Sequence, residues 1–134
     1  MPPHGDLTGT IIGAGIDVHS AYGPGLLESV YTPCLAAGLL ERGLDVAVAQ
    51  PVPLIYRGVR IERTFVIDLL VDDTVIVEVK SVSAIADIHV AQLLSYLRLT
   101  NRQVGLLLNF NVVAMKDGIR RVVNDYVDAR GNRL

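Results

Sequence analysis

Two nearly continuous apolar segments, residues 64–71 and 74–80, each contain one carboxylate, and this feature constrains the fold more than any other. Segments of this length that are rich in valine, isoleucine and leucine are typical of central strands covered on both faces. Asp68 interrupts the first segment and Glu78 the second. Burying a carboxylate without a partner is costly, so the two groups either form buried ion pairs or bind a cation.

Lys80 adds an amine to the second segment. Side chains alternate faces along a strand, so Glu78 and Lys80 share one face. Magnesium takes oxygen ligands, which Asp68 and Glu78 would supply. Lys80 would orient or help deprotonate an attacking water and offset the charge that grows on a phosphorus centre. The short pattern by itself is explained equally well by a salt bridge within the sheet.

The connection between the two segments decides whether the carboxylates meet. A tight two-residue turn at residues 72–73 would place Asp68 opposite Val77, so that Asp68 and Glu78 would face opposite sides of the sheet. A three-residue loop at residues 72–74, or one β-bulge, would instead pair Asp68 with Glu78. We predict such an irregularity, because a regular two-residue hairpin would exclude a shared metal site.

The rest of the chain alternates between helical and strand periodicity. Helical spacing predicts helices at residues 8–22, from the break at residues 23–25 through residue 42, and at residues 87–100. Strand spacing predicts strands at residues 46–49, 52–56, from residue 59 onward after a turn at 57–58, and at 103–109. Residues 119–123 fit either a short strand or a helical turn. The prediction is an α/β protein with a mixed β-sheet flanked by helices, in the order αβββαβ.

Length and composition favour one domain. The chain has 134 residues, of which 51% are apolar and 19% charged, enough to bury one core. We expect a single domain over residues 1–134, with an ordered core at about 8–124 and frayed ends. No apolar stretch approaches the roughly 20 residues that cross a bilayer, and residues 1–6 lack the pattern of a secretory signal. The single cysteine cannot form an internal disulfide, so we expect a cytoplasmic protein without a membrane segment.

The charge distribution bears on nucleic-acid binding. The net charge of −2 argues against it, because phosphate-binding domains usually carry a basic surplus. Residues 1–41 contain no lysine or arginine, whereas basic residues gather near the C-terminus: Lys116, Arg120, Arg121, Arg130 and Arg133. A basic patch and a solvated basic tail both fit this distribution.

A further motif accompanies the two segments. Residues 25–31, GLLESVY, resemble the motif of the GxxExxY family, and the similarity extends from about residue 8 to residue 124. Other segments that resemble this family are residues 16–19, 67–71, 77–80, 88–97 and 109–112. The family is grouped with the PD-(D/E)XK nuclease-like superfamily, and the Gln92-x-x-x-Tyr96 spacing resembles a helix motif of its RecB-like branch. The resemblance implies a PD-(D/E)XK restriction-endonuclease-like core.

The resemblance also implies a site. It implies a divalent metal, Mg²⁺ or Mn²⁺, with the ligands Glu28, Asp68, Glu78 and the carbonyl of Val79. It implies that Lys80 is catalytic together with the carboxylates Asp68 and Glu78.

Gln92 and Tyr96 would bind or position the substrate from the following helix. They are four residues apart and therefore lie on one helical face, although the same spacing fits a helix that packs on the sheet. His19 and His89 are interpreted as structural histidines and not as metal ligands. Tyr31, like Tyr22, is expected in the core with a polar tip.

The leading hypothesis is a metal-dependent nuclease that hydrolyses phosphodiester bonds of DNA, ahead of RNA, with a magnesium-activated water. The alternative is a catalytically silent binding protein with the same fold, as a homodimer or as one part of a repair or defence system. A glycosidase with Asp68 and Glu78 as its two carboxylates leaves Lys80 and the lack of tryptophan unexplained.

Overall fold

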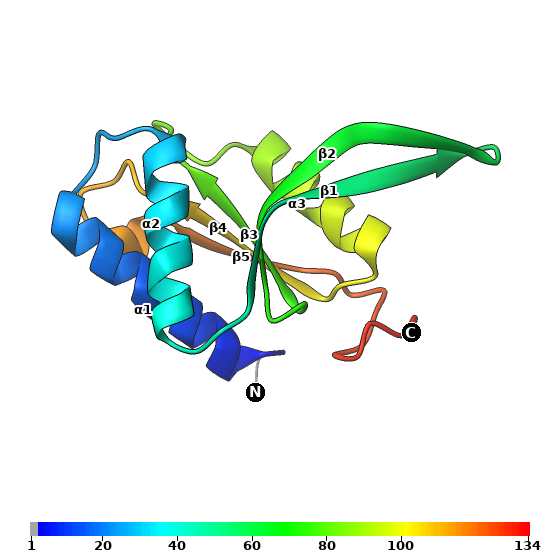
Figure 1. Cartoon of the computed structure of the whole chain (residues 1–134), viewed down its shortest axis with the longest axis horizontal. Helices are drawn as coiled ribbons and strands as arrows, with labels where there is room; N and C mark the ends of the chain where they lie inside the picture. The colour runs from blue at the N-terminus through cyan, green and yellow to red at the C-terminus, as the bar shows by residue number, and fades with distance from the viewer. Residues whose placement is uncertain (1–2) are drawn as a thin grey trace.

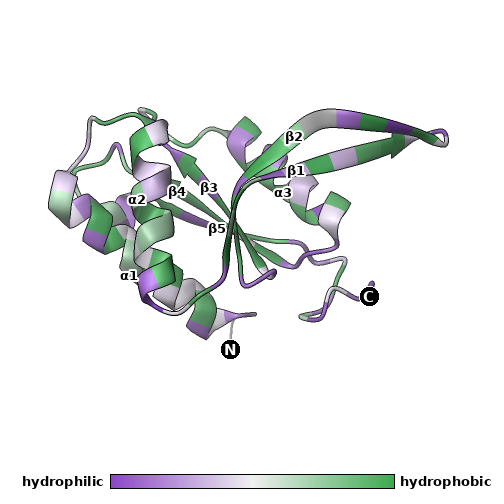
Figure 2. Cartoon of the chain, viewed as in Figure 1, coloured by the Kyte–Doolittle hydropathy of each residue, from purple (hydrophilic) through white to green (hydrophobic). Residues whose placement is uncertain are grey.

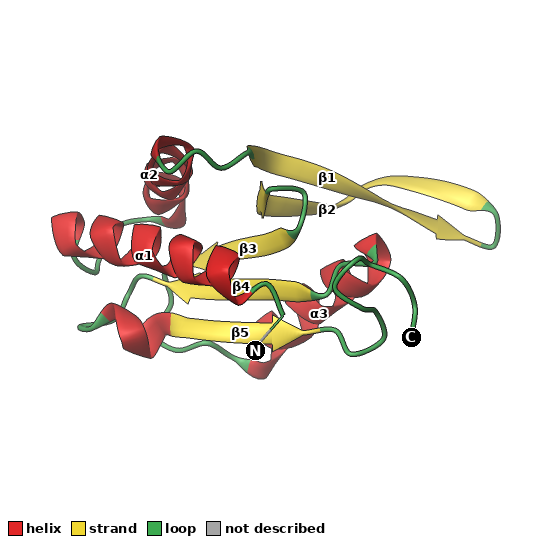
Figure 3. Ribbon diagram, turned by 90° about the horizontal axis from the view of Figure 1, so that it is seen from below, coloured by secondary structure: helices red, strands yellow, loops and turns green. Residues whose placement is uncertain are grey.

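Five strands form one mixed sheet in the order β1-β2-β3-β4-β5, as Figure 3 shows from top to bottom. The computed structural model describes residues 3–134, and for Arg63 and Thr64 it describes the backbone alone. The strands are β1 (Val46–Tyr56), β2 (Val59–Val71), β3 (Val75–Lys80), β4 (Val104–Asn109) and β5 (Ile119–Val123). Strands β3 and β4 run parallel and the other neighbours antiparallel, which confirms the predicted mixed sheet.

Three helices cover the two faces of this sheet (Figure 1). They are α1 (Gly5–Tyr22), α2 (Glu28–Glu41) and α3 (Asp87–Thr100), and a short 3₁₀ turn, η1 (Met115–Gly118), precedes β5. Helices α1 and α2 share one buried cluster with the sheet, and α3 shares the other. Strands β3 and β4 are parallel, so the chain has to cross back over the sheet between them, and helix α3 makes this crossover. Antiparallel neighbours need only a hairpin. The predicted αβββαβ order is present, with α1 before it and β5 after it.

The central strands are the most deeply buried elements. Residues 75–79 of β3 and all of β4 are buried, as the apolar segments predict for strands covered on both faces. Gly105 in β4 is part of this packing, because an added Cβ would lie 2.7 Å from a methyl group of Leu93 on α3. The sheet is therefore most rigidly enclosed where Glu78 lies.

The helices and chain ends differ in detail from the sequence predictions. Helix α1 begins at Gly5, before the predicted residue 8, and α2 continues through Pro33. After Asn124, where we expected fraying, the chain folds back, and Val127 is buried and bridges to Arg133. Met1 and Pro2, part of the segment examined for a secretory signal, lie outside the described residues. Within residues 3–134, no helix combines the length and apolar character needed to cross a membrane.

The first two strands extend beyond the rest of the molecule as a two-stranded ribbon (Figure 1). The predicted turn at Arg57 and Gly58 is present, with positive φ at both residues, and Tyr56 pairs with Val59. The predicted separate strands at 46–49 and 52–56 are one continuous strand, β1. Strand β2 thus runs from this ribbon into the part of the sheet that the helices cover, where it carries Asp68.

Candidate active site

The β2–β3 hairpin has the irregular register that the sequence predicts. Val71 pairs with Val75 and Leu69 with Val77, so residues 72–74 form a three-residue connection. Asp72 and Asp73 both have positive φ, and the Thr74 amide donates to the Val71 carbonyl at 3.0 Å. Continued by one position, this register sets Asp68 opposite Glu78, on the sheet face that α3 covers. The register prediction is confirmed.

Each carboxylate accepts a hydrogen bond from the backbone of the other strand. The Asp68 amide donates to Glu78 Oε2 at 2.9 Å, and the Val79 amide donates to Asp68 Oδ2 at 2.9 Å. Backbone pairing between β2 and β3 ends one position earlier, at Leu69 and Val77. Elsewhere between these strands, backbone carbonyl groups accept the hydrogen bonds of the amides. Here the two carboxylates accept them instead, which fixes the orientation of both side chains.

Burial makes the ionised state of Glu78 unfavourable. Its side chain is almost fully buried, and burial, followed by the adjacent charge of Asp68, raises the pKa of Glu78 to about 8. The amide hydrogen bond from Asp68 and the positive charge of Lys80 act in the opposite direction. At neutral pH the pair Asp68 and Glu78 therefore retains a proton, and a divalent cation between them would favour release of that proton.

Lys80 lies two residues after Glu78 on the same face, half-buried at the end of β3. Its positive charge lowers the pKa of Glu78, so the ammonium group is close enough to act on the carboxylate. The Lys80 carbonyl accepts a hydrogen bond of 3.0 Å from the Phe110 amide. The backbone that carries this amine is therefore held by β4 and the residue after it.

Glu28, the first residue of α2, reaches the end of the same strand. Glu28 Oε2 accepts a hydrogen bond from the Ser81 amide at 3.0 Å, and the Ser81 hydroxyl donates to the Leu26 carbonyl at 2.7 Å. Gly25 has a φ of +105°, which favours glycine at the bend before the helix. These contacts attach the start of α2 to the residue that follows Lys80.

Tyr31 completes the same attachment from inside the core. Its ring stacks on Phe110 with centroids 4.6 Å apart, and its hydroxyl donates to the Gly23 carbonyl at 2.6 Å. The Leu26 amide donates back to that hydroxyl at 3.1 Å. The glycine, glutamate and tyrosine of the 25–31 segment thus have three distinct structural roles: a bend, a link to β3 and a buried anchor.

The three predicted carboxylates are not equally close. Asp68 and Glu78 meet directly, whereas Glu28 contacts the next residue beyond the strand. Within residues 3–134, no group of three or more histidine, cysteine, aspartate or glutamate side chains is close enough to hold a metal ion. A site with Glu28 as a third ligand would therefore need its side chain to move toward the pair.

Tyr96 faces the carboxylate pair from α3. Burial, and then the negative charges of Glu78 and Asp68, raise its pKa above the usual value of 10. Its ring also meets Phe65 edge to face, with centroids 5.2 Å apart. Gln92 lies one turn earlier on α3 and is exposed. The helix therefore brings Tyr96 to the site and leaves the Gln92 amide open to solvent.

Both predicted structural histidines make hydrogen bonds within the fold. His19 Nε2 lies 2.7 Å from the Val112 carbonyl, and His89 Nδ1 accepts a hydrogen bond from the Ala86 amide at the start of α3. The core prediction holds for Tyr31 but is wrong for Tyr22, which is 60% exposed. Tyr22 is the last residue of α1, and the chain turns away at Gly23, beyond the part of the helix that packs on the sheet.

Asn109 and Ser81 hold the loop after β3, and sequence reasoning missed Ser81. Asn109 Nδ2 donates to the Val82 carbonyl at 3.0 Å, and Asn109 Oδ1 accepts from the Val82 amide at 3.1 Å. The available signals were a buried asparagine at the end of an apolar strand and a serine directly after Glu-x-Lys.

The C-terminal basic residues are divided between structure and solvent. Arg121 donates to Thr8 Oγ1 at 2.8 Å and also to the Pro3 carbonyl, which attaches the start of α1 to β5. The other four are exposed: Lys116, Arg120, Arg130 and Arg133. One of the five cations is therefore used to hold the fold.

Comparison with known proteins gives a family for this chain. Neither the curated proteins nor the solved structures gave a match. A family model described as the PD-(D/E)XK nuclease superfamily matches residues 5–122. The matched range includes the hairpin with Asp68 and Glu78, the lysine that follows, and both flanking helices. Since it also covers most of the chain, the protein belongs to the PD-(D/E)XK nuclease superfamily.

Proposed function

We propose that this protein is a metal-dependent nuclease that hydrolyses phosphodiester bonds of DNA, ahead of RNA. The observation that carries the proposal is the paired carboxylates Asp68 and Glu78, with the amine of Lys80 on the same face, in a chain of a nuclease superfamily. A buried carboxylate whose pKa is raised to about 8 is costly for stability, and such groups are concentrated at functional sites.

The donor atoms suit a hard cation. Nucleases of this superfamily typically use divalent metals, and the carboxylates offer oxygen ligands only, the preference of magnesium and manganese. Asp68 and Glu78 would hold the ion, and we assign the carbonyl of Val79 and, after its side chain moves toward the pair, the carboxylate of Glu28 as further ligands. The bound ion would lower the pKa of a water molecule and stabilise charge on the phosphate.

The other residues would orient the reactants. Lys80 would hold the attacking water and offset the negative charge that develops on the phosphate oxygens. Tyr96 would donate a hydrogen bond to a phosphate oxygen, since its raised pKa keeps the hydroxyl protonated. Gln92, exposed one turn away, would contact the substrate further along the same helix. Both assignments make α3 the element that positions the nucleic acid.

We also infer a finer family placement. The 25–31 segment supports membership of the GxxExxY family, because its glycine, glutamate and tyrosine each have a separate structural role. Gln92 and Tyr96 on one face of α3 support the RecB-like branch. A cytoplasmic location fits the single cysteine, which forms no internal disulfide.

Thermal unfolding with and without millimolar Mn²⁺ tests the metal site. We expect Mn²⁺ to raise the midpoint of the wild type and to have no effect on Asp68→Asn, because a ligand stabilises the state that binds it. Glu41→Gln is the matched control, since Glu41 is exposed at the far end of α2, about 20 Å of helix from Glu28. An equal shift in the wild type and in Asp68→Asn would contradict the proposed ligands.

Incubation with linear and circular DNA, and with RNA, tests the reaction. The wild type is expected to cut DNA in the presence of metal, and Asp68→Asn is expected to leave it intact while Glu41→Gln cuts normally. A metal-induced shift without cutting of any substrate would favour the second candidate, a catalytically silent binding protein. The exposed apolar ribbon formed by β1 and β2 is the observation that favours this candidate.

A further inference from the structure

The outer part of the β1–β2 ribbon exposes an apolar face. We call residues 53–64 the arm. Cross-strand partners share a face, so the pairs Tyr56 with Val59 and Leu54 with Ile61 lie on one side of the arm. Tyr56 is 63% and Val59 62% exposed, and Figure 2 shows the apolar colouring of the end of β1. A two-stranded hairpin without a covering layer is only marginally stable in water, so this face is suited to contact another surface.

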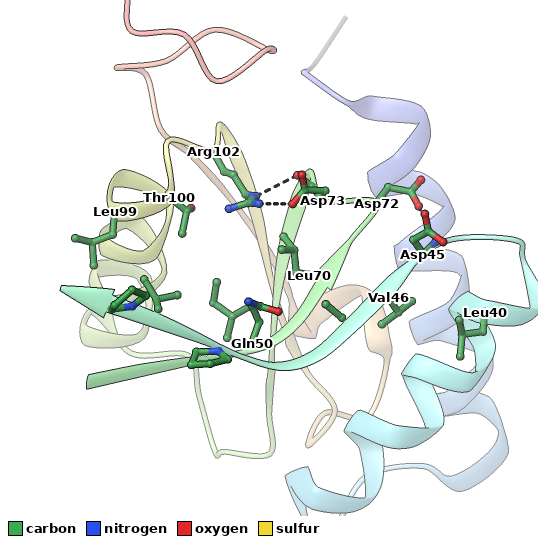
Figure 4. A pocket seen from close by; sticks show the side chains of 15 residues that line it. Leu40, Asp45, Val46, Gln50, Leu70, Asp72, Asp73, Leu99, Thr100 and Arg102 are labelled. Carbon is green, nitrogen blue, oxygen red and sulfur yellow. Dashed lines mark hydrogen bonds and ion pairs between the residues drawn. The ribbon is translucent and has the colours of Figure 1, made fainter. Parts of the chain in front are cut away.

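A groove lies beside the base of the arm. It is an open hollow of about 990 Å³ between β1 and the C-terminal end of α3 (Figure 4). Its apolar lining includes Val52, Ile67 and Leu70, which belong to the cluster under α3. Leu99, 43% exposed on α3, forms part of its wall. Of the lining side chains, Leu40 and Leu99 are exposed and can therefore contact apolar side chains from outside.

The arm and the groove carry opposite charges. Residues 53–64 contain three arginines and one glutamate, a net charge of +2 in a chain whose total is −2. The groove is lined by three exposed carboxylates, Asp45, Asp72 and Asp73, and by one cation, Arg102, paired with Asp73. Carboxylates at this edge would repel a phosphate backbone but attract the arm. The complementarity therefore favours protein over nucleic acid as the occupant of the groove.

We propose that a second copy of this chain is the partner, with the arm of each protomer in the groove of the other. The arm and the groove share the strand β1, so one two-fold axis can satisfy both contacts at once. The arm is roughly 17 Å long and 10 Å wide, so reciprocal exchange, which covers one face of each arm and the groove surface opposite it, buries on the order of 700 Å². This area is below the range of stable specific interfaces and fits a weak dimer that dissociates on dilution.

Sedimentation equilibrium on the full chain, from about 1 µM to about 200 µM, tests this arrangement. The wild type is expected to approach twice the monomer mass as its concentration rises. Arg57→Asp is expected to weaken association at least tenfold and to stay folded, because aspartate before glycine suits the positive-φ turn at residues 57–58. Tyr56→Thr with Val59→Thr, which keeps β propensity, is expected to weaken association by a similar factor.

Mixing two variants identifies the contact. Asp45→Arg changes an exposed groove residue and leaves intact the hydrogen bond from its own amide to Asp72. Arg57→Asp and Asp45→Arg should each associate weakly alone and form a heterodimer when mixed, since the mixed dimer has one native and one charge-reversed arm–groove contact. A monomer at every concentration, or a dimer unaffected by Arg57→Asp and Tyr56→Thr, overturns the proposal. Loss of DNA binding in these variants at unchanged mass also overturns it and assigns the arm to nucleic acid.

Discussion

The two ends of strand β2 have similar apolar residues but differ in burial. The comparison shows how burial decides what such residues contribute. At its inner end, Ile67 and Leu69 are fully buried, and Asp68 between them is fixed by backbone hydrogen bonds. At its outer end, Val59 and Ile61 alternate with charged residues and are exposed. Helices cover the inner end on both faces, whereas the arm has a single partner strand. The same apolar residue types thus surround the carboxylate of Asp68 at one end of the strand. At the other end they form an exposed apolar surface.

The largest expected effect concerns Lys80, at the inner end of the sheet. Lys80→Gln should lower the rate of DNA cutting by about 10³-fold, because the variant lacks the charge that would offset the developing phosphate charge. The Mn²⁺-induced shift in the unfolding midpoint should persist, since both carboxylates remain. Single-turnover cutting at saturating metal measures the effect. A normal rate in this variant would remove Lys80 from the proposed mechanism.

The next prediction compares the stability of the two environments directly. Leu106→Ala in the fully buried strand β4 should lower the free energy of unfolding by about 3 kcal/mol, through lost burial and the cavity that remains. Val59→Ala in the arm should change it by no more than about 0.5 kcal/mol, since the side chain is mostly exposed. Urea unfolding of dilute, monomeric protein measures both. Equal losses of unfolding free energy in the two variants would mean that Val59 is buried against other residues of the same chain.

The raised pKa of Glu78 predicts a pH dependence of stability. A folded-state pKa of about 8, above the usual 4.5, means that the native state binds more protons between these values. This stabilising contribution is complete below about pH 4.5 and is lost as the pH rises through 8. Without metal, we expect a loss of about 2 kcal/mol between about pH 5 and about pH 8, less than the full shift implies, because relaxation and water penetration lower the cost of a buried charge.

Glu78→Gln provides the control for that pH dependence. Glutamine can still accept the hydrogen bond from the Asp68 amide, but it does not titrate. The variant should therefore be more stable than the metal-free wild type at pH 8 and should no longer respond to Mn²⁺. Urea unfolding at several pH values checks both points. The same pH slope in the variant and the wild type would assign the proton to another group.

The smallest expected effect tests the attachment of α2 to β3. Ser81→Ala removes the hydrogen bond from the serine hydroxyl to the Leu26 carbonyl and should cost about 1 kcal/mol. The Ser81 amide still donates to Glu28, so the metal response should remain. Thermal unfolding with and without Mn²⁺ separates the two effects, and loss of the metal response would show that the start of α2 depends on this hydroxyl.

Much of the local structure could be predicted from the sequence. The period of apolar residues identified the strands, the turn at Arg57 and Gly58, and the helix that carries Tyr96. The need to bring Asp68 and Glu78 together predicted the three-residue connection at residues 72–74. These features depend on neighbours close along the chain, where side-chain alternation and turn geometry leave few alternatives.

Contacts between distant segments could not be predicted in the same way. Nothing local indicates that Glu28 accepts the amide of Ser81, 53 residues later, or that Asn109 holds the loop at Val82. The exposure of Tyr22 was also missed, because an apolar spacing identifies a helix face but not where the covering sheet ends. A periodic pattern indicates which side chains lie on one face of a helix or strand. It does not indicate which other segment packs against that face.

The sequence by itself therefore determined the elements of this protein, the register that pairs its two central carboxylates and its resemblance to a nuclease superfamily. The tertiary structure alone decided that Glu28 binds the Ser81 amide, that Tyr22 is exposed, and that the arm is left uncovered. The physical reason is that alternation and turn geometry are local properties. Burial and charge environment depend instead on which distant segments the topology brings together.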